Sequence, residues 1–260
     1  MADGAALCAG CGRALRDGMR FCPGCGQARD AATPAPARPS RDQRAQAAGF
    51  AENWGELKRL AWIFGLLLAS SFVAGISQRW DPSPWPQVYM AIFDAAVIVV
   101  FAAVRYQQLV FLLRVHHISG KRALWLAGAS VVFIAVMGSY FWVLKQLGLP
   151  IQSASSEFVA AGWPIWSMFL LISVMPAVFE ELAFRGVIQS SLERVFNSRD
   201  AWLIQAALFS VLHLLPMMFP SHFLMGLWFG LIRRYSRSLY PGILLHGVWN
   251  ALVLIDELSG

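Results

Sequence analysis

The chain has 260 residues, of which 57% are hydrophobic and 14% are charged. Soluble domains contain about 25% charged residues, so this composition excludes an ordinary soluble protein and indicates a membrane protein. The net charge is +6, but apolar segments separate the basic residues instead of leaving them in one stripe, which argues against nucleic acid as a partner.

All four cysteines lie near the N-terminus in two CxxC pairs, each followed by glycine: Cys8, Cys11, Cys22 and Cys25. Two such pairs in a cytosolic segment are typical of a closed tetrahedral Zn²⁺ site with four thiolate ligands. About 20 residues cannot bury a core of their own, so bound metal would supply the free energy of folding. We predict a zinc ribbon with a structural Zn²⁺ over residues 1–28; a redox-active dithiol is the alternative.

Residues 29–50 are rich in Ala, Pro and Arg and include Pro34, Pro36 and Pro39. Such a composition predicts a disordered or semi-extended linker. The first 50 residues contain no apolar segment of the kind found in signal peptides. We therefore expect the first hydrophobic helix to direct insertion, and the membrane domain to occupy residues 51–260.

Seven apolar segments follow the linker. A helix needs about 20 mainly apolar residues to cross the hydrocarbon core of a bilayer. The segments are 60–77, 88–113, 123–144, a fourth from about Trp163 into Glu180-Glu181, 201–219, a short sixth at 222–232, and 239–255. The pattern predicts an all-α polytopic membrane protein with about seven to eight transmembrane helices.

Basic residues mark alternate breaks between these segments. Seven spans would bring the four basic breaks to one side, and the basic side of a membrane protein is normally cytosolic. The opposite breaks contain Arg79 and Lys145. We predict a multi-pass protein of the cell (inner) membrane with a cytoplasmic N-terminus and an external C-terminus. The residues that carry this prediction are Lys58, Arg59, Arg114, Lys121, Arg122, Arg194, Arg199, Arg233, Arg234 and Arg237.

Two adjacent glutamates stand in the fourth segment, where each acidic side chain costs about 2.5–3.5 kcal/mol on insertion scales. Glu181 and Arg185 are four residues apart, so they share one helix face in the favoured acid-first order. Glu180 is rotated by about 100° from Glu181. We predict a Glu181–Arg185 ion pair near the cytosolic end of the span and a Glu180 without a partner on its own helix. Pro176 should bend the helix at the carbonyl of Ile172.

Later segments add two histidines and an amide. Phe209 and His213 share a helix face, and the imidazole could serve as a second base or as an acid for a leaving amine. His246 and Asn250 are again four residues apart and could donate hydrogen bonds to a developing oxyanion. A purely structural polar cluster is the alternative for these residues together with Glu180.

Other polar residues are interpreted as structural. Asp94 is expected to form a hydrogen bond between helices, because Arg105 lies about 16 Å away along the same helix; a role in the substrate path is the alternative. His222, near a span end, is expected to be a packed residue. His116 and His117 are expected at the surface of a basic loop.

Glu180-Glu181-x-x-x-Arg185, Phe209-x-x-x-His213 and His246-x-x-x-Asn250 together resemble the three motifs of the CAAX-protease and bacteriocin-processing family. The resemblance covers roughly residues 160–255. It implies an all-helical membrane protease, usually with about eight helices and a cavity open toward the cytosol. It also implies that Glu180 and His213 activate a water, while His246 and Asn250 stabilise the oxyanion.

Two Glu and two His could also hold zinc, but the HExxH pattern is absent, so we favour hydrolysis without a catalytic metal. The expected partners are the bilayer and a membrane-associated protein or peptide substrate. A non-catalytic scaffold or bacteriocin-immunity factor, whose ribbon binds a cytosolic partner, is the alternative function. A transporter is a weaker one, since paired broken helices in matching halves are not visible.

Overall fold

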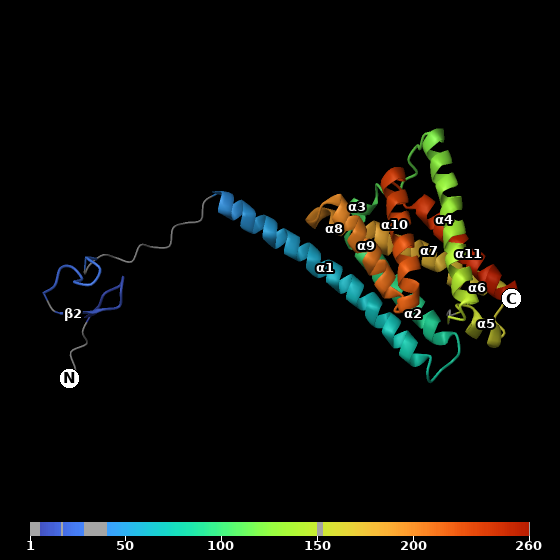
Figure 1. Cartoon of the computed structure of the whole chain (residues 1–260), viewed down its shortest axis with the longest axis horizontal. Helices are drawn as coiled ribbons and strands as arrows, with labels where there is room; N and C mark the ends of the chain where they lie inside the picture. The colour runs from blue at the N-terminus through green and yellow to red at the C-terminus, as the bar shows by residue number, and fades with distance from the viewer. Residues whose placement is uncertain (1–5, 17, 29–40, 150–152, 260) are drawn as a thin grey trace. The chain divides into compact units, whose positions relative to one another are not determined.

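The computed structural model describes residues 6–16, 18–28, 41–149 and 153–259, and the chain divides into two compact units, Met1–Phe50 and Ala51–Gly260 (Figure 1). In the first unit, strands β1 (Ala6–Leu7) and β2 (Ala14–Leu15) pair antiparallel, with Ala6 opposite Leu15. A single bridge joins Phe21 to Ala28. Each CxxC pair therefore lies at a turn between two short extended segments.

The two CxxC turns have the same backbone hydrogen bonds. Cys8 N donates to Arg13 O at 2.9 Å, and Cys22 N donates to Gln27 O at 2.8 Å. Gly12 and Gly26 close the turns with left-handed φ values of 68° and 75°. Glycine adopts this conformation without steric cost, which explains its place after the second cysteine of each pair.

Helix α1 spans Arg41–Ser77, so residues 41–50 are helical where a linker was predicted. Its first residues are Arg, Asp, Gln and Ala, and no proline follows Pro39 in this stretch. Ala, Arg and Gln favour helix strongly, which explains the error. The remainder of the predicted linker, 29–40, lies outside the described residues.

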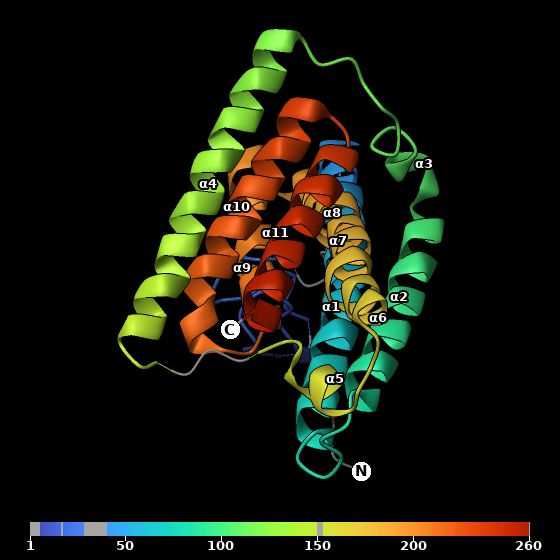
Figure 2. The ribbon, with the colours of Figure 1, turned by 90° about the vertical axis from the view of Figure 1, so that its right-hand side faces the viewer.

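The second unit is an all-α bundle (Figure 2). Helix α7 contacts both α2 and α11, and Figure 2 shows α4 and α2 on opposite flanks. The elements after α1 are α2 (Trp85–Val104), α3 (Tyr106–Leu109), α4 (Gly120–Gln146), α5 (Ser156–Ala160), α6 (Ile165–Met168), η1 (Phe169–Val174), α7 (Met175–Glu180), η2 (Glu181–Ile188), α8 (Gln189–Val195), α9 (Ser198–Leu212), η3 (Pro216–Met218), α10 (Phe219–Ser236) and α11 (Tyr240–Ser259).

Five helices of the described residues are long and apolar enough to cross a membrane: Asn53–Ser77, Trp85–Val104, Gly120–Gln146, Ile165–Val195 and Tyr240–Ser259. The predicted number was seven to eight. Helix α9 has 15 residues, and the predicted span 201–219 stops at Leu212. Helix α10 has 18 residues, but His222, Arg233 and Arg234 lower its hydropathy. It also extends beyond the predicted limits 222–232 at both ends.

Helices α9 and α10 pack closely against each other, because small residues let their backbones approach. A Cβ atom on Gly226 would lie 2.6 Å from the Cα of Ala206. Gln205 Nε2 donates to Gly226 O at 2.7 Å, and Trp202 Nε1 donates to Leu227 O at 2.8 Å. The pair thus forms a hairpin of two short helices held by side-chain hydrogen bonds to backbone.

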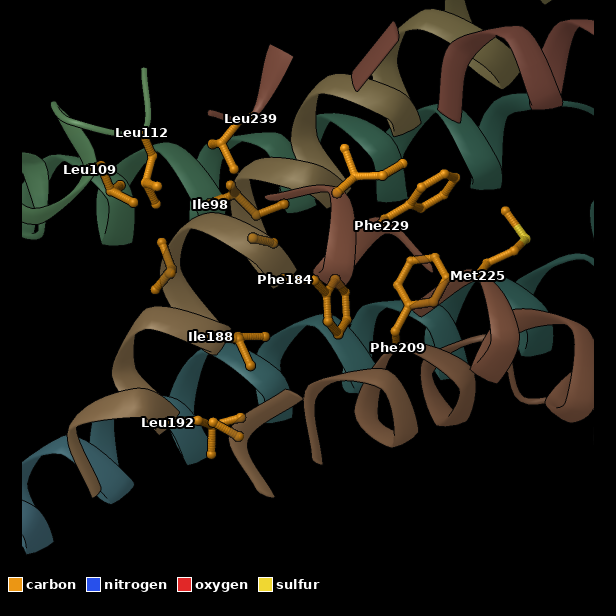
Figure 3. Packing of buried hydrophobic residues seen from close by; sticks show 14 of the residues in the cluster. Ile98, Leu109, Leu112, Phe184, Ile188, Leu192, Phe209, Met225, Phe229 and Leu239 are labelled. Atoms are coloured by element: carbon orange, nitrogen blue, oxygen red, sulfur yellow. The ribbon is translucent and has the colours of Figure 1, made fainter. Parts of the chain in front are cut away.

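The buried core lies where this hairpin meets the long Ile165–Val195 segment. Phe184, Ile188, Phe209 and Phe229 are fully buried there, and Figure 3 shows the rings of Phe184, Phe209 and Phe229 gathered beside Met225. The Phe184 and Phe209 rings meet edge to face at 5.1 Å between centroids. These aromatic rings form one wall beside the charged residues described below.

Candidate active site

Glu181 and Arg185 form a buried ion pair in η2, as predicted from their spacing. Arg185 Nη1 lies 3.0 Å from Glu181 Oε1, and both side chains are almost wholly inaccessible. The Arg185 guanidinium also faces the rings of Phe209 and Phe229, at 4.4 and 5.2 Å from their centroids. Charge pairing and aromatic contacts together compensate for removing this cation from water.

The position of the pair along the helix differs from the prediction. The helical segment is continuous from Ile165 to Val195, so Glu180 and Glu181 lie midway along it rather than near its cytosolic end. The residues after Arg185 remain buried from Gly186 to Gln189. Burial against the rest of the bundle explains why the span continues beyond the charged pair.

His246 of α11 lies between the two glutamates. Its Nδ1 atom is 3.2 Å from Glu181 Oε1, and its Nε2 atom is 3.8 Å from Glu180 Oε2. The ring is buried and stacks on Phe229 at 5.0 Å. Because Nδ1 faces a carboxylate, it carries the hydrogen. Glu180 has no partner on its own helix and keeps 26% of its side chain accessible.

Gly242 lies one turn before His246 and provides space for Glu181. A Cβ atom at this position would lie 2.9 Å from Glu181 Oε2, closer than real Cβ contacts allow. Any larger residue here would push the carboxylate out of line with Arg185 and His246. The glycine of the Pro241-Gly242 pair therefore has a steric role in the site.

Asn250 binds the part of the helix that Pro176 disturbs. Pro176 has no backbone N–H, so the carbonyl of Ile172 loses its normal helical donor. Asn250 Nδ2 donates to that carbonyl at 3.3 Å, and the preceding residues form the wide turns of η1. The amide has two hydrogens, so one of them remains for another acceptor.

His213 caps the C-terminal end of α9, and its Nδ1 lies 2.9 Å from Phe209 O. Nδ1 must donate to a carbonyl, which leaves Nε2 as the acceptor in the neutral ring. Within the described residues no hydrogen bond joins His213 to Glu180. The Phe209 ring lies near both histidines, at 5.0 Å from His213 and 6.2 Å from His246.

Residues 162–252 match the family model described as type II CAAX prenyl endopeptidase Rce1-like. This part of the chain is therefore similar to a family of the CAAX-protease and bacteriocin-processing type. No curated protein and no solved structure matches the chain. The Rce1-like match contains all seven residues singled out from the sequence, Glu180, Glu181, Arg185, Phe209, His213, His246 and Asn250, and none of the cysteines.

His222 belongs to the same group of side chains in the Rce1-like region, although the sequence suggested only a packing role. Its ring lies 3.7 Å from that of His213, between centroids, with a tilt of 37°. Its Nδ1 lies 2.9 Å from Met218 O, which repeats the arrangement of His213 and Phe209. That shared four-residue spacing from an apolar residue was the only available signal in the sequence.

Asp94 has the structural role expected of it. Ser70 of α1 donates a hydrogen bond of 2.5 Å to Asp94 Oδ1 of α2. Arg105, which was judged too distant for Asp94, instead pairs with the buried carboxylate of Glu56. Asp94 of α2 and Arg105, the residue directly after this helix, thus bind different partners on α1.

The four cysteines outside the Rce1-like region can hold a metal ion. Their sulfur atoms all lie within 4.8 Å of one another, and two Sγ–Sγ distances are 3.6 Å. Zn–S bonds of 2.3 Å in a tetrahedron place sulfurs about 3.8 Å apart. The backbone N–H groups of Gly24 and Cys25 lower the pKa of the Cys22 thiol to about 6, which favours the thiolate form that binds metals.

Proposed function

We propose that the Rce1-like domain is an intramembrane endopeptidase that cleaves a membrane-associated protein or peptide with an activated water. The observation that best supports this proposal is the position of His246 between Glu180 and Glu181. Two carboxylates, one cation and one imidazole are costly to keep in an apolar bundle. A structural ion pair would need only Glu181 and Arg185.

The two glutamates take different roles in the proposed reaction. Glu181 is held by Arg185 and orients His246 through Nδ1. Glu180 is partly accessible and has no hydrogen-bond partner for Oε2 among the described residues. It is therefore the base that takes a proton from water, with His213 Nε2 as the second acceptor in the site.

The remaining groups act on the tetrahedral intermediate. The hydroxide formed from water adds to the substrate carbonyl. The developing oxyanion receives a hydrogen bond from the second amide hydrogen of Asn250 and, when the His246 ring carries a hydrogen on both nitrogens, one from its Nε2. The C–N bond then breaks, and the proton taken from water passes to the leaving amine from Glu180 or His213. The products are a carboxylate and an amine.

The N-terminal unit has a separate role in this proposal. Its four cysteines bind a structural Zn²⁺, which supports folding and not hydrolysis. In this proposal the protein lies in the inner membrane with its N-terminus in the cytoplasm, where the ribbon is available to a cytosolic partner. The clustering of basic side chains at one end of the membrane spans supports this orientation.

The test compares membrane proteomes, by peptide termini, of cells carrying wild type, Glu180→Gln and Asp256→Asn. Asp256 is exposed and pairs with Lys145, so the control makes the same acid-to-amide change outside the site. New termini should be present with wild type and the control and absent with Glu180→Gln. If Glu180→Gln rescues a deletion phenotype as well as wild type does, the scaffold or immunity role replaces the protease.

A further inference from the structure

A cavity of about 200 Å³ lies between α1, α2 and the η2–α8 segment. Its walls are largely apolar and include Ile63 of α1, Val100 of α2 and Ile188 of η2. Two arginines also line it, Arg59 and Arg105. The cavity thus combines apolar side chains from three elements with the guanidinium groups of Arg59 in α1 and of Arg105 directly after α2.

The charge around this cavity is unbalanced. The buried carboxylate of Glu56 is shared by three arginines: Arg59 at 3.3 Å, Arg194 at 3.4 Å, and Arg105. Three positive charges against one negative charge leave an excess of two. The Arg59 and Arg194 side chains are 53% and 44% accessible, so they can contact a further anion without breaking the buried Glu56–Arg105 pair.

The position of the arginines defines the kind of ligand. Arg59 precedes the apolar part of the α1 span, where a helix meets the headgroup layer of a bilayer. A ligand here must present an anionic group to the arginines and a hydrocarbon chain to the cavity. Free phosphate lacks the chain, and phosphatidylcholine carries a cation beside its phosphate.

We propose that this cavity binds an anionic phospholipid, with its phosphate at Arg59 and Arg194 and part of an acyl chain against Ile63, Val100 and Ile188. The bound lipid contacts η2, the element that contains Glu181 and Arg185. The site is separate from the proposed hydrolysis, and its ligand can be measured without a known substrate.

The full-length protein is placed in nanodiscs of phosphatidylcholine with a minor fraction of phosphatidylglycerol, and the retained lipids are measured by native mass spectrometry after release. Wild type should retain phosphatidylglycerol in preference to phosphatidylcholine. Arg59→Gln with Arg194→Gln should lower that preference roughly tenfold, since each basic residue near the headgroups contributes attraction. Arg194→Gln alone should give an intermediate value, which keeps the test decisive if the double variant unfolds.

Arg79→Gln is the matched control, because it removes the same charge from an exposed arginine just after the C-terminal end of α1, about five turns from Arg59. It should leave the lipid preference unchanged. Val100→Trp, which fills the cavity, should lower retention of phosphatidylglycerol while leaving all the arginines in place. Equal retention of both lipids by wild type, an unchanged preference in the double variant, or full competition by glycerol phosphate would each overturn the proposal.

Discussion

The carboxylate of Glu181 binds side chains from two helical segments, and its negative charge balances the buried charge of Arg185. Arg185 comes from its own segment, His246 comes from α11, and Gly242 leaves room for the second oxygen. Removing one partner of a buried pair leaves the other charge uncompensated. The structural consequences of losing Glu181 should therefore exceed those of losing Glu180.

Glu181→Gln should lower the free energy of unfolding by about 3–5 kcal/mol, because Arg185 would remain buried without a counter-charge. Glu180→Gln should leave thermal stability within a few degrees of wild type, since its carboxylate has no ion-pair partner on its own helix. Thermal unfolding of both variants in the same detergent measures the difference. Equal stability of the two variants would contradict the proposed division between a supporting and a reactive glutamate.

His222→Phe tests whether the imidazole of His222 contributes to proton transfer as well as to packing against His213. Phenylalanine fills similar space beside His213 but cannot exchange a proton. We expect roughly tenfold less of the product termini, a smaller loss than the 10²–10⁴ typical of a group that transfers the proton itself. His117→Phe, at an exposed loop position, is the control. Unchanged cleavage by His222→Phe would mean that His222 only packs against His213.

At the scale of elements, α11 positions the site through its contacts with the disturbed helix before Glu180. Ser173 Oγ donates to Gly247 O at 2.8 Å, and Asn250 donates to Ile172 O. Both contacts use polar groups at or beside the wide turns of η1. The helix irregularity therefore serves as the attachment point for the segment that carries His246.

Pro176→Ala should make the helix more regular and the site less active. The new N–H group would bond to Ile172 O and displace Asn250, while an interior proline is unfavourable by about 3 kcal/mol relative to alanine. We expect unchanged or higher thermal stability together with fewer product termini. A variant that is more stable and fully active would show that the Asn250–Ile172 contact is not needed to position α11.

Local geometry made some of this predictable. The Glu181–Arg185 pair follows from the four-residue spacing. The backbone carbonyl of Ile172 that lacks a helical donor follows from the missing N–H of Pro176. The contact of His213 with His222 does not follow, because it depends on the sharp reversal between α9 and α10. Leu214 adopts a left-handed φ of 57° there, and nothing in its side chain indicates this. Residues 201–219 therefore looked like one continuous span.

At the scale of the whole molecule, the cysteine unit should respond to metal removal independently of the membrane unit. Chelation at neutral pH should abolish the ordered ribbon, because its described residues form two short strands and one cluster of three buried side chains, too little to hold it together without metal. The thermal transition of the membrane unit should not move. Zinc content after dialysis, with Cys8→Ser as the variant that loses a ligand, provides the measurement. A chelated protein with an unchanged ribbon would contradict a structural metal.

The two ends of the bundle differ in charge, and this difference predicts the orientation of the protein in the membrane. The prediction holds although α9 is too short and α10 too polar to count as membrane spans. Contacts at one end join Glu56 to Arg105 and Arg194, whereas contacts at the other join Lys145 to Asp256. The chain reaches alternate ends through α9 and α10 as it would through full spans, because the hairpin returns it to the basic end before α11.

A reporter fused after Ser259 should therefore be active outside the cytoplasm, and one fused before α1 should be active inside it. The expected result follows from the basic end facing the cytosol and from α11 carrying the chain away from that end. The double substitution Lys145→Glu and Arg79→Glu should leave both reporters unchanged, since these two basic residues lie at the end opposite the cytosolic excess of positive charge. A cytosolic C-terminal reporter in wild type would mean that α9 and α10 do not traverse the bundle between opposite faces of the membrane.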